Sequence, residues 1–160
     1  MRNQWLNTGN LPRPVAQHDR FEHKVLLCVW PNYEGPIHFE LVPSGHGITA
    51  QLYSEQLERM YEVLKRKYHA LVNRKHVLLH QSNAPPYVAQ TTKQKITELE
   101  AIELLPQPAY SPDFAPSDYY LFRSMVYYLQ GRRFQNVDDV EVGITKFFAS
   151  KSKEWCMRGI

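Results

Sequence analysis

The sequence has no long apolar run, few cysteines and little excess of charge of either sign. No stretch approaches the roughly 20 consecutive apolar residues that a membrane-spanning helix needs. The first residues, Met-Arg-Asn-Gln-Trp, also lack the apolar core of a secretory signal. We therefore expect no membrane partner for this chain.

The two cysteines, Cys28 and Cys156, are far apart and match no metal-ligand spacing. This pattern favours two free thiols in a reducing compartment over a disulfide or a zinc site. The sequence also contains no glycine-rich phosphate loop, no Gly-x-Ser-x-Gly elbow and no Cys/His nucleophile pair. Several common enzyme classes are thereby disfavoured.

The charge balance is only mildly basic. The 19 basic and 16 acidic residues leave a net charge of +3. An ordinary solvated surface explains this value as well as a nucleic-acid partner does, so charge alone does not identify a function. The length of 160 residues is enough for one domain with a real core.

The first half of the chain predicts a hairpin followed by a helix. Residues 24–30 and 37–42 are apolar and rich in β-branched and aromatic side chains, and a Pro-Asn-Tyr-Glu-Gly-Pro turn separates them. Thr49 is a suitable N-cap for a helix that runs through about Lys67. Its apolar positions at helical spacing are Tyr53, Leu57, Met60, Tyr61 and Leu64.

The next segment predicts a strand–helix–strand unit. Residues 77–79 form a short buried strand, residues 87–100 a helix and residues 102–105 a second strand. Strands joined by such a crossover lie parallel to one another. Composition and element order together indicate an α/β fold.

Two closing helices are expected after a proline-rich loop. The first runs over residues 117–129, with Ser117 as its N-cap and Gly131 at its end. The second opens at Asn136 or Val137 and continues to about Lys153.

Two polar motifs follow the predicted parallel strands. Residues 80–90 read HQSNAPPYVAQ, and residues 108–122 read PAYSPDFAPSDYYLF. Polar groups just past the carboxyl ends of strands are typical of sites in α/β folds. The motifs resemble the HQDNAP and PYSPDLAPSDYHLF blocks of mariner transposases, in the Tc1/mariner group. Weaker similarity extends over most of the chain, including Gln4-Trp5 and the stretch from Gly131 to Phe134.

This resemblance implies an RNase H-like fold, a mixed sheet with flanking helices. The similar region of the family begins after the first central strand, so we expect that strand to be lacking here. Residues 1–20 resemble the loop between the first two strands, an extended arm that reaches a partner subunit in the family. Residues 21–160 then correspond to a partial catalytic domain, and a homodimer through the arm is implied.

The family cuts and joins DNA with two divalent ions, Mg²⁺ or Mn²⁺, held by three aspartates. Asp118 matches the third aspartate, and Ser82 stands where the second is expected. The first lies upstream of the similar region, and Asp19 does not match its motif. From the sequence alone, Asp118 serves equally well as a helix cap, and the resemblance favours the metal-ligand role. We expect the ion not to be bound stably.

Basic residues give the candidates for DNA contact, although a solvated helix end explains most of them as well. They are Lys65, Arg66, Lys67, Arg74, Lys75, Arg132 and Arg133. Contacts of this kind to the phosphate backbone predict weak, sequence-independent binding. A protein of this family is expected in the nucleus.

Three functions remain open at this point. The first is a transposase-derived catalytic domain that has lost strand cleavage, and the second is a non-catalytic DNA-binding or subunit-interaction module. The third is a working nuclease that holds its metal ions with other ligands. This third function is disfavoured, because Asp118 is the only one of the three family aspartates that is matched in this sequence.

Overall fold

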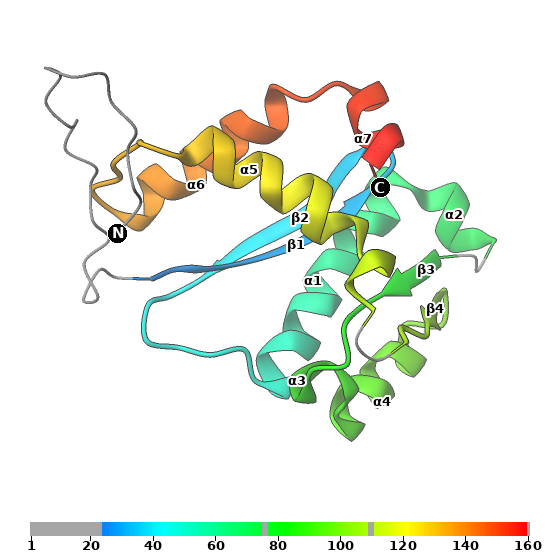
Figure 1. Ribbon diagram of the computed structural model, residues 1–160. Helices are drawn as coiled ribbons and strands as arrows, with labels where there is room; N and C mark the ends of the chain where they lie inside the picture. The colour runs from blue at the N-terminus through cyan, green and yellow to red at the C-terminus, as the bar shows by residue number, and fades with distance from the viewer. Residues whose placement is uncertain (1–23, 75–76, 109–110, 160) are drawn as a thin grey trace, which may run out of the picture.

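The computed structural model describes residues 24–74, 77–108 and 111–159. Its architecture is mixed α/β, with two small sheets lying against one long helix (Figure 1). Strands β1 (Leu26–Asn32) and β2 (Gly35–Val42) form an antiparallel hairpin, whereas β3 (Val77–His80) and β4 (Ile102–Leu105) pair in parallel. Both predicted pairings are confirmed.

The two sheets share no ladder of hydrogen bonds among the described residues. Each sheet has two strands, in the orders β1-β2 and β3-β4. The mixed α/β architecture with small sheets agrees with the fold class expected from the sequence. The predicted arm of residues 1–20 lies outside the described residues, so its dimer contact stays a prediction.

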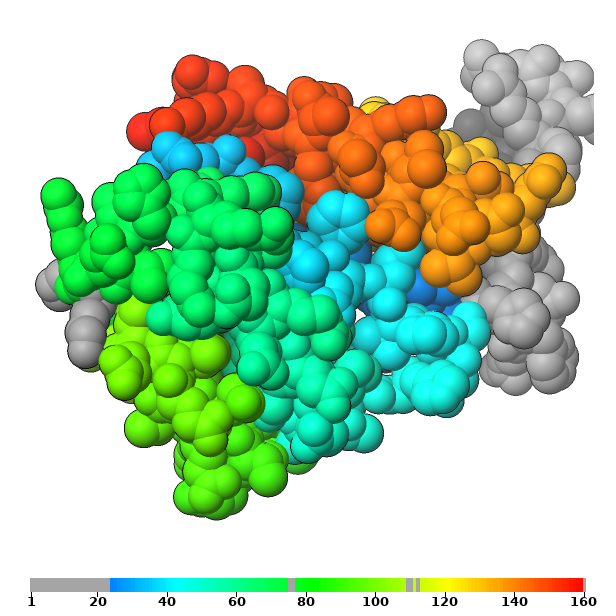
Figure 2. Space-filling model, turned by 180° about the vertical axis from the view of Figure 1, so that it is seen from behind, coloured from blue at the N-terminus to red at the C-terminus, as the bar shows by residue number. Residues whose placement is uncertain are grey.

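The long helix α1 (Ala50–Lys67) begins where its N-cap was predicted. The Thr49 Oγ1 atom accepts a hydrogen bond from the Leu52 amide at 3.1 Å, which satisfies one of the free N–H groups of the first turn. A short helix, α2 (His69–Asn73), follows directly. Figure 2 shows α1 from behind, lying over the hairpin.

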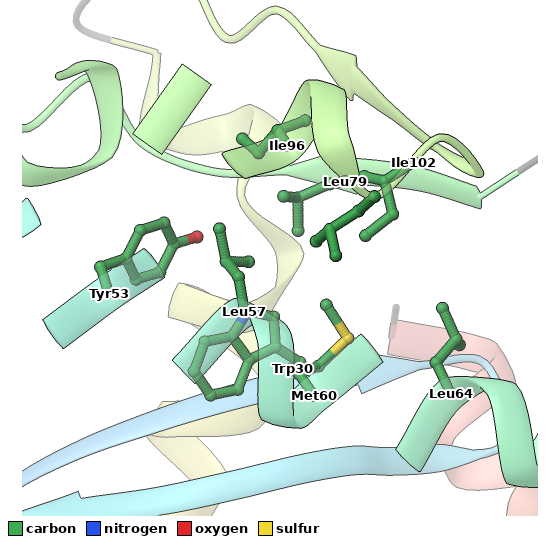
Figure 3. Close-up of a cluster of buried hydrophobic side chains, with 9 residues drawn as sticks. Trp30, Tyr53, Leu57, Met60, Leu64, Leu79, Ile96 and Ile102 are labelled. Carbon is green, nitrogen blue, oxygen red and sulfur yellow. The ribbon is translucent and has the colours of Figure 1, made fainter. Parts of the chain in front are cut away.

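The apolar residues of α1 recur at helical spacing and therefore lie on one face of the helix. This face forms the centre of the larger core cluster, here called the α1 cluster. Leu57 is fully buried, and Figure 3 shows it pointing toward Leu79 of β3. Trp30 reaches the same cluster from the hairpin. The buried members are Trp30, Tyr53, Leu57, Met60, Leu64, Leu79, Ile96, Leu99 and Ile102. The helix therefore contacts both sheets through one apolar stripe.

The crossover between β3 and β4 differs from the single helix expected over residues 87–100. It consists of α3 (Pro85–Val88) and α4 (Gln90–Glu98), separated by Ala89 with ψ 150°. The buried Thr92 hydroxyl donates to the Pro86 carbonyl at 2.7 Å, so the break is held by a hydrogen bond across it. Helical periodicity carries no signal for such a contact.

The closing helices also differ from the prediction. A 3₁₀ turn, η1 (Pro112–Phe114), precedes a π-helical segment, η2 (Ser117–Phe122), which runs into α5 (Arg123–Leu129). The last predicted helix is two helices, α6 (Val137–Ala149) and α7 (Lys153–Gly159). The end at Gly131 is confirmed by its positive φ of 79°, which favours glycine.

A second core cluster, the α6 cluster, packs η2, α5 and α6 on the face of the hairpin opposite α1. Its buried members are Leu121, Met125, Ile144 and Phe147, and Leu27, Phe39 and Leu41 of the hairpin pack against it. Figure 1 shows the hairpin between α5 on one side and α1 on the other. Within the described ranges, none of the helices has both the length and the apolar character to cross a membrane.

A matched pair of substitutions tests the α1 cluster. Leu57 is 0% exposed and Leu78 is 59% exposed. We expect Leu57→Ala to lower the free energy of unfolding by about 2–5 kcal/mol, because it removes buried methyl groups and leaves a cavity. Leu78→Ala should cost less than about 1 kcal/mol. Urea unfolding followed by circular dichroism measures both, and equal losses would contradict this packing.

Candidate catalytic site

The loop after β3 is fixed by the side chain of Gln81. The Tyr53 hydroxyl donates to Gln81 Oε1 at 2.8 Å, and Gln81 Nε2 donates to the Tyr87 carbonyl at 2.8 Å. One amide group thus connects α1, the end of β3 and helix α3. This network holds the backbone beside Ser82 in one conformation.

The tyrosine at the centre of this network is itself tightly held. Tyr53 is 5% exposed, and its ring packs edge-on against Tyr87 with centroids 4.5 Å apart. The Trp30 ring stacks on its other side at 6.2 Å. Burial raises the pKa of the Tyr53 hydroxyl, so the group stays a neutral donor near neutral pH.

The carboxyl ends of the two parallel strands are also linked. Asn83 Nδ2 donates to the Gln107 carbonyl at 2.9 Å, which joins the loop after β3 to the loop after β4. Ser82 lies between Gln81 and Asn83, and its side chain is exposed. The residue at this position therefore projects from a loop that is anchored on both sides.

Asp118, the matching third aspartate, lies in the first turn of η2 and is exposed. The prediction that Ser117 caps this helix is wrong. Pro116 already has helical φ and ψ of −57° and −27°, and the Asp118 amide donates to the Ala115 carbonyl at 2.9 Å. No described hydrogen bond uses the Asp118 carboxylate as a cap, and π-helical turns occur often at functional sites.

The π-helical segment is held against the C-terminal helix. The Tyr120 hydroxyl donates to the Trp155 carbonyl at 3.1 Å, and the two rings lie 4.6 Å apart. A Cβ atom on Gly159 would come within 1.8 Å of the Tyr120 ring, so only glycine allows this approach. On the inner side of the π-helical segment, the Leu121 side chain is buried and only 1% exposed.

The residues present do not fit a pair of divalent ions. A hard cation such as Mg²⁺ is held by several oxygen ligands, usually with at least one or two carboxylates. Within the part of the chain that the structure describes, no group of three His, Cys, Asp or Glu side chains could hold a metal ion. Ser82 supplies a neutral hydroxyl where a carboxylate is expected.

The predicted DNA-contact residues fall into two separate groups. Lys65, Arg66 and Lys67 end α1, and Arg74 caps α2, whereas Arg132 and Arg133 follow α5 at the opposite end of the molecule (Figure 1). Lys75 lies outside the described residues.

Several of these cations already have partners. Lys65 forms an ion pair with Glu62 at 2.5 Å, and Lys67 Nζ donates to the Ile37 carbonyl at 3.4 Å. The Arg132 guanidinium lies 4.1 Å over the Tyr128 ring. The exposed side chains of Arg66 and Arg133 are therefore more available to a phosphate.

A charged cluster between β2 and α1 was not predicted from the sequence. Arg59 Nε and Nη2 donate to the two Glu40 carboxylate oxygens at 2.7 and 2.8 Å, and His38 Nε2 lies 2.7 Å from Glu40 Oε1. The Arg59 hydrogen bonds, aided by His38, lower the pKa of Glu40 to about 2. Alternation along β2 places the side chains of His38 and Glu40 on one face of the strand. Their partner Arg59 lies on α1, 19 residues from Glu40 along the chain, so residue spacing does not predict the contact.

Comparison with known proteins is consistent with this fold. Residues 1–74 match the family model described as Transposase (partial DDE domain). The chain is 38% identical over 157 residues to human histone-lysine N-methyltransferase SETMAR, and 35% identical over 157 residues to the Mariner Mos1 transposase of Drosophila mauritiana. These alignments cover 98% of this chain but only 23% and 45% of the two relatives.

Solved structures agree with the similarity found at the level of sequence. The catalytic domain of Mos1 mariner transposase matches with a TM-score of 0.81 and 37% identity over 86% of this chain and 67% of that one. The Mos1 mariner paired end complex with Mn matches with a TM-score of 0.88 and 35% identity over 99% of this chain and 46% of that one. The fold and motifs thus define a DDE transposase catalytic domain with the RNase H-like arrangement. More narrowly, the chain belongs to the mariner transposase family.

The Glu40 cluster generates a pH prediction. Because the folded-state pKa of Glu40 lies below its ordinary value of 4.5, its ion pair stabilises the fold above that pH, and the stabilisation is lost as pH falls toward about 2. We expect Glu40→Gln to lower the midpoint of thermal unfolding at pH 7, and the difference from wild type to shrink below pH 4.5. Glu58→Gln, at an exposed position of α1, is the control. A difference that does not change with pH would contradict this assignment.

Proposed function

We propose that this chain is a transposase-derived domain that binds DNA without cleaving it. The observation that carries the proposal is Ser82, which stands on the anchored loop where the family places its second catalytic aspartate. A serine hydroxyl brings no negative charge, and charge is what makes a carboxylate able to hold a divalent ion against its hydration shell.

Binding to DNA is supported by the family and by the exposed cations. The matched Mos1 structures are a catalytic domain and a paired end complex with Mn. In this chain, exposed cations such as Arg66 and Arg133 can contact phosphates, and contacts of that kind read no sequence. A nuclear location follows from a DNA partner, and the two free cysteines suit a reducing compartment.

The first test is DNA cleavage. Purified chain incubated with supercoiled plasmid and Mg²⁺ or Mn²⁺ is expected to produce no nicked product above a heat-inactivated control, because a serine in place of a catalytic carboxylate removes several kcal/mol of transition-state stabilisation. The informative control is Asp118→Ala. Metal-dependent nicking by the wild-type chain that disappears in Asp118→Ala would refute the proposal.

The second test is the salt dependence of DNA binding. Fluorescence anisotropy with two 20-base-pair duplexes of unrelated sequence is expected to give equal affinities, weakening steeply between about 50 and 200 mM salt as counterions are released. Dissociation constants near physiological salt should lie around 10⁻⁴ to 10⁻⁶ M, the usual range for non-specific binding. A strong preference for one sequence would show readout of base edges and would contradict this account.

A further inference from the structure

One face of the continuous segment formed by η2 and α5 is unusually apolar for a solvent-exposed helix. Tyr127 is 81% exposed, Val126 is 67% exposed and Tyr119 is 55% exposed. Arg123 and Gln130 are exposed on the same side. Spacings of three and four residues place these five side chains on one stripe, here called the α5 face.

The opposite side of the same segment is rigidly packed. Leu121 and Met125 are 1% and 4% exposed and belong to the α6 cluster. Tyr120 is fixed by its hydrogen bond to the Trp155 carbonyl. Figure 1 draws α5 in front of the hairpin. The exposed rings are therefore displayed by a fixed scaffold and not by a frayed helix.

We infer that the α5 face binds an unpaired DNA strand, an inference that rests on the DNA-binding function proposed above. Tyrosine rings stack on bases of any sequence, and an arginine among them contacts the phosphates. Tyr119 directly follows Asp118 in η2, so the α5 face begins beside the aspartate that the resemblance matches to the family's third aspartate. From Arg123 to Leu129, α5 rises about 9 Å, which roughly three stacked nucleotides span.

The distribution of charge sets the course of the strand. The acidic residues Asp113 and Asp118 lie at the start of the segment, and Arg132 and Arg133 lie at its end. Arg132 is held there, because its Nε donates to the Tyr128 carbonyl at 3.1 Å. Phosphates are therefore favoured between Arg123 and the C-terminal end of α5. The helix dipole does not attract an anion at that end, so the arginine side chains must supply the attraction.

Unpaired DNA fits this face better than duplex DNA. Rings that project from a helix surface stack on bases only when the bases are not already stacked and paired within a duplex. At the end of α1 the aromatic side chains are only partly exposed, and the Tyr61 ring is covered by Lys65 at 4.8 Å, so the cations there offer chiefly backbone contact. The two surfaces are therefore separable by experiment.

The first part of the test compares tyrosines. Binding of a labelled 20-nucleotide thymidine strand is measured by anisotropy for wild type, Tyr127→Ala, Tyr119→Ala and Tyr127→Phe. Each alanine variant should weaken binding about fivefold or more, while Tyr127→Phe keeps the ring and the affinity. Tyr33→Ala is the matched control, since Tyr33 is 46% exposed in the hairpin turn. Thermal unfolding of each variant confirms that its fold is unchanged.

The second part compares arginines. Arg123→Gln should make the slope of log affinity against log salt shallower by about 0.7 for the single strand, and Arg66→Gln should leave it unchanged. If the wild type binds duplex DNA equally well, or if the tyrosine variants bind like wild type while Arg66→Gln weakens binding, the α5 face is excluded and the proposed function stands. If the chain binds no DNA at all, both fail. If Tyr127→Ala instead converts a dimer to a monomer without changing DNA affinity, the face serves a second copy and the inference is wrong.

Discussion

The packing of α1 between the two sheets is the constraint on which the rest of this structure depends. Among the described residues the sheets share no backbone ladder, so they are joined through side chains of one helix. Leu57 and Met60 touch the cluster that contains Trp30 on the hairpin and Leu79 on β3. The hydrophobic effect has no preferred direction, so it does not by itself position one sheet against the other. The relative position of the two sheets is therefore set by how the side chains on the apolar stripe of α1 pack between them.

The same helix also builds the candidate site. Tyr53 occupies one position of the apolar stripe, and its ring is buried like its neighbours. Its hydroxyl, however, reaches Gln81 and fixes the loop that carries Ser82. None of these hydrogen bonds uses the side chain at position 82. The hydrogen bonds that hold this loop therefore do not depend on which side chain stands at position 82.

The elements that could be predicted are those defined by local periodicity. The buried positions of α1, its cap at Thr49 and the two strand pairings all follow from spacing and residue type. The breaks could not be predicted, because distant contacts produce them. Ala89 interrupts the crossover where Thr92 bonds back to Pro86, and a Pro-Ser-Asp sequence that normally starts a helix at serine instead continues one.

The candidate site likewise has features that could be predicted from the sequence and features that could not. Motif similarity predicts Ser82 and Asp118 as site positions, and both side chains are exposed in the structure. The cluster of Glu40, Arg59 and His38 depends on which residues meet in space, and no short-range pattern reveals it. Native-state hydrogen exchange tests the central role of α1 most directly. If α1 alone holds the β3–β4 unit, the amides of Leu79 and Leu105 exchange no more slowly than those of Leu57 and Met60, whereas protection in β3 and β4 that outlasts the opening of α1 would contradict the account.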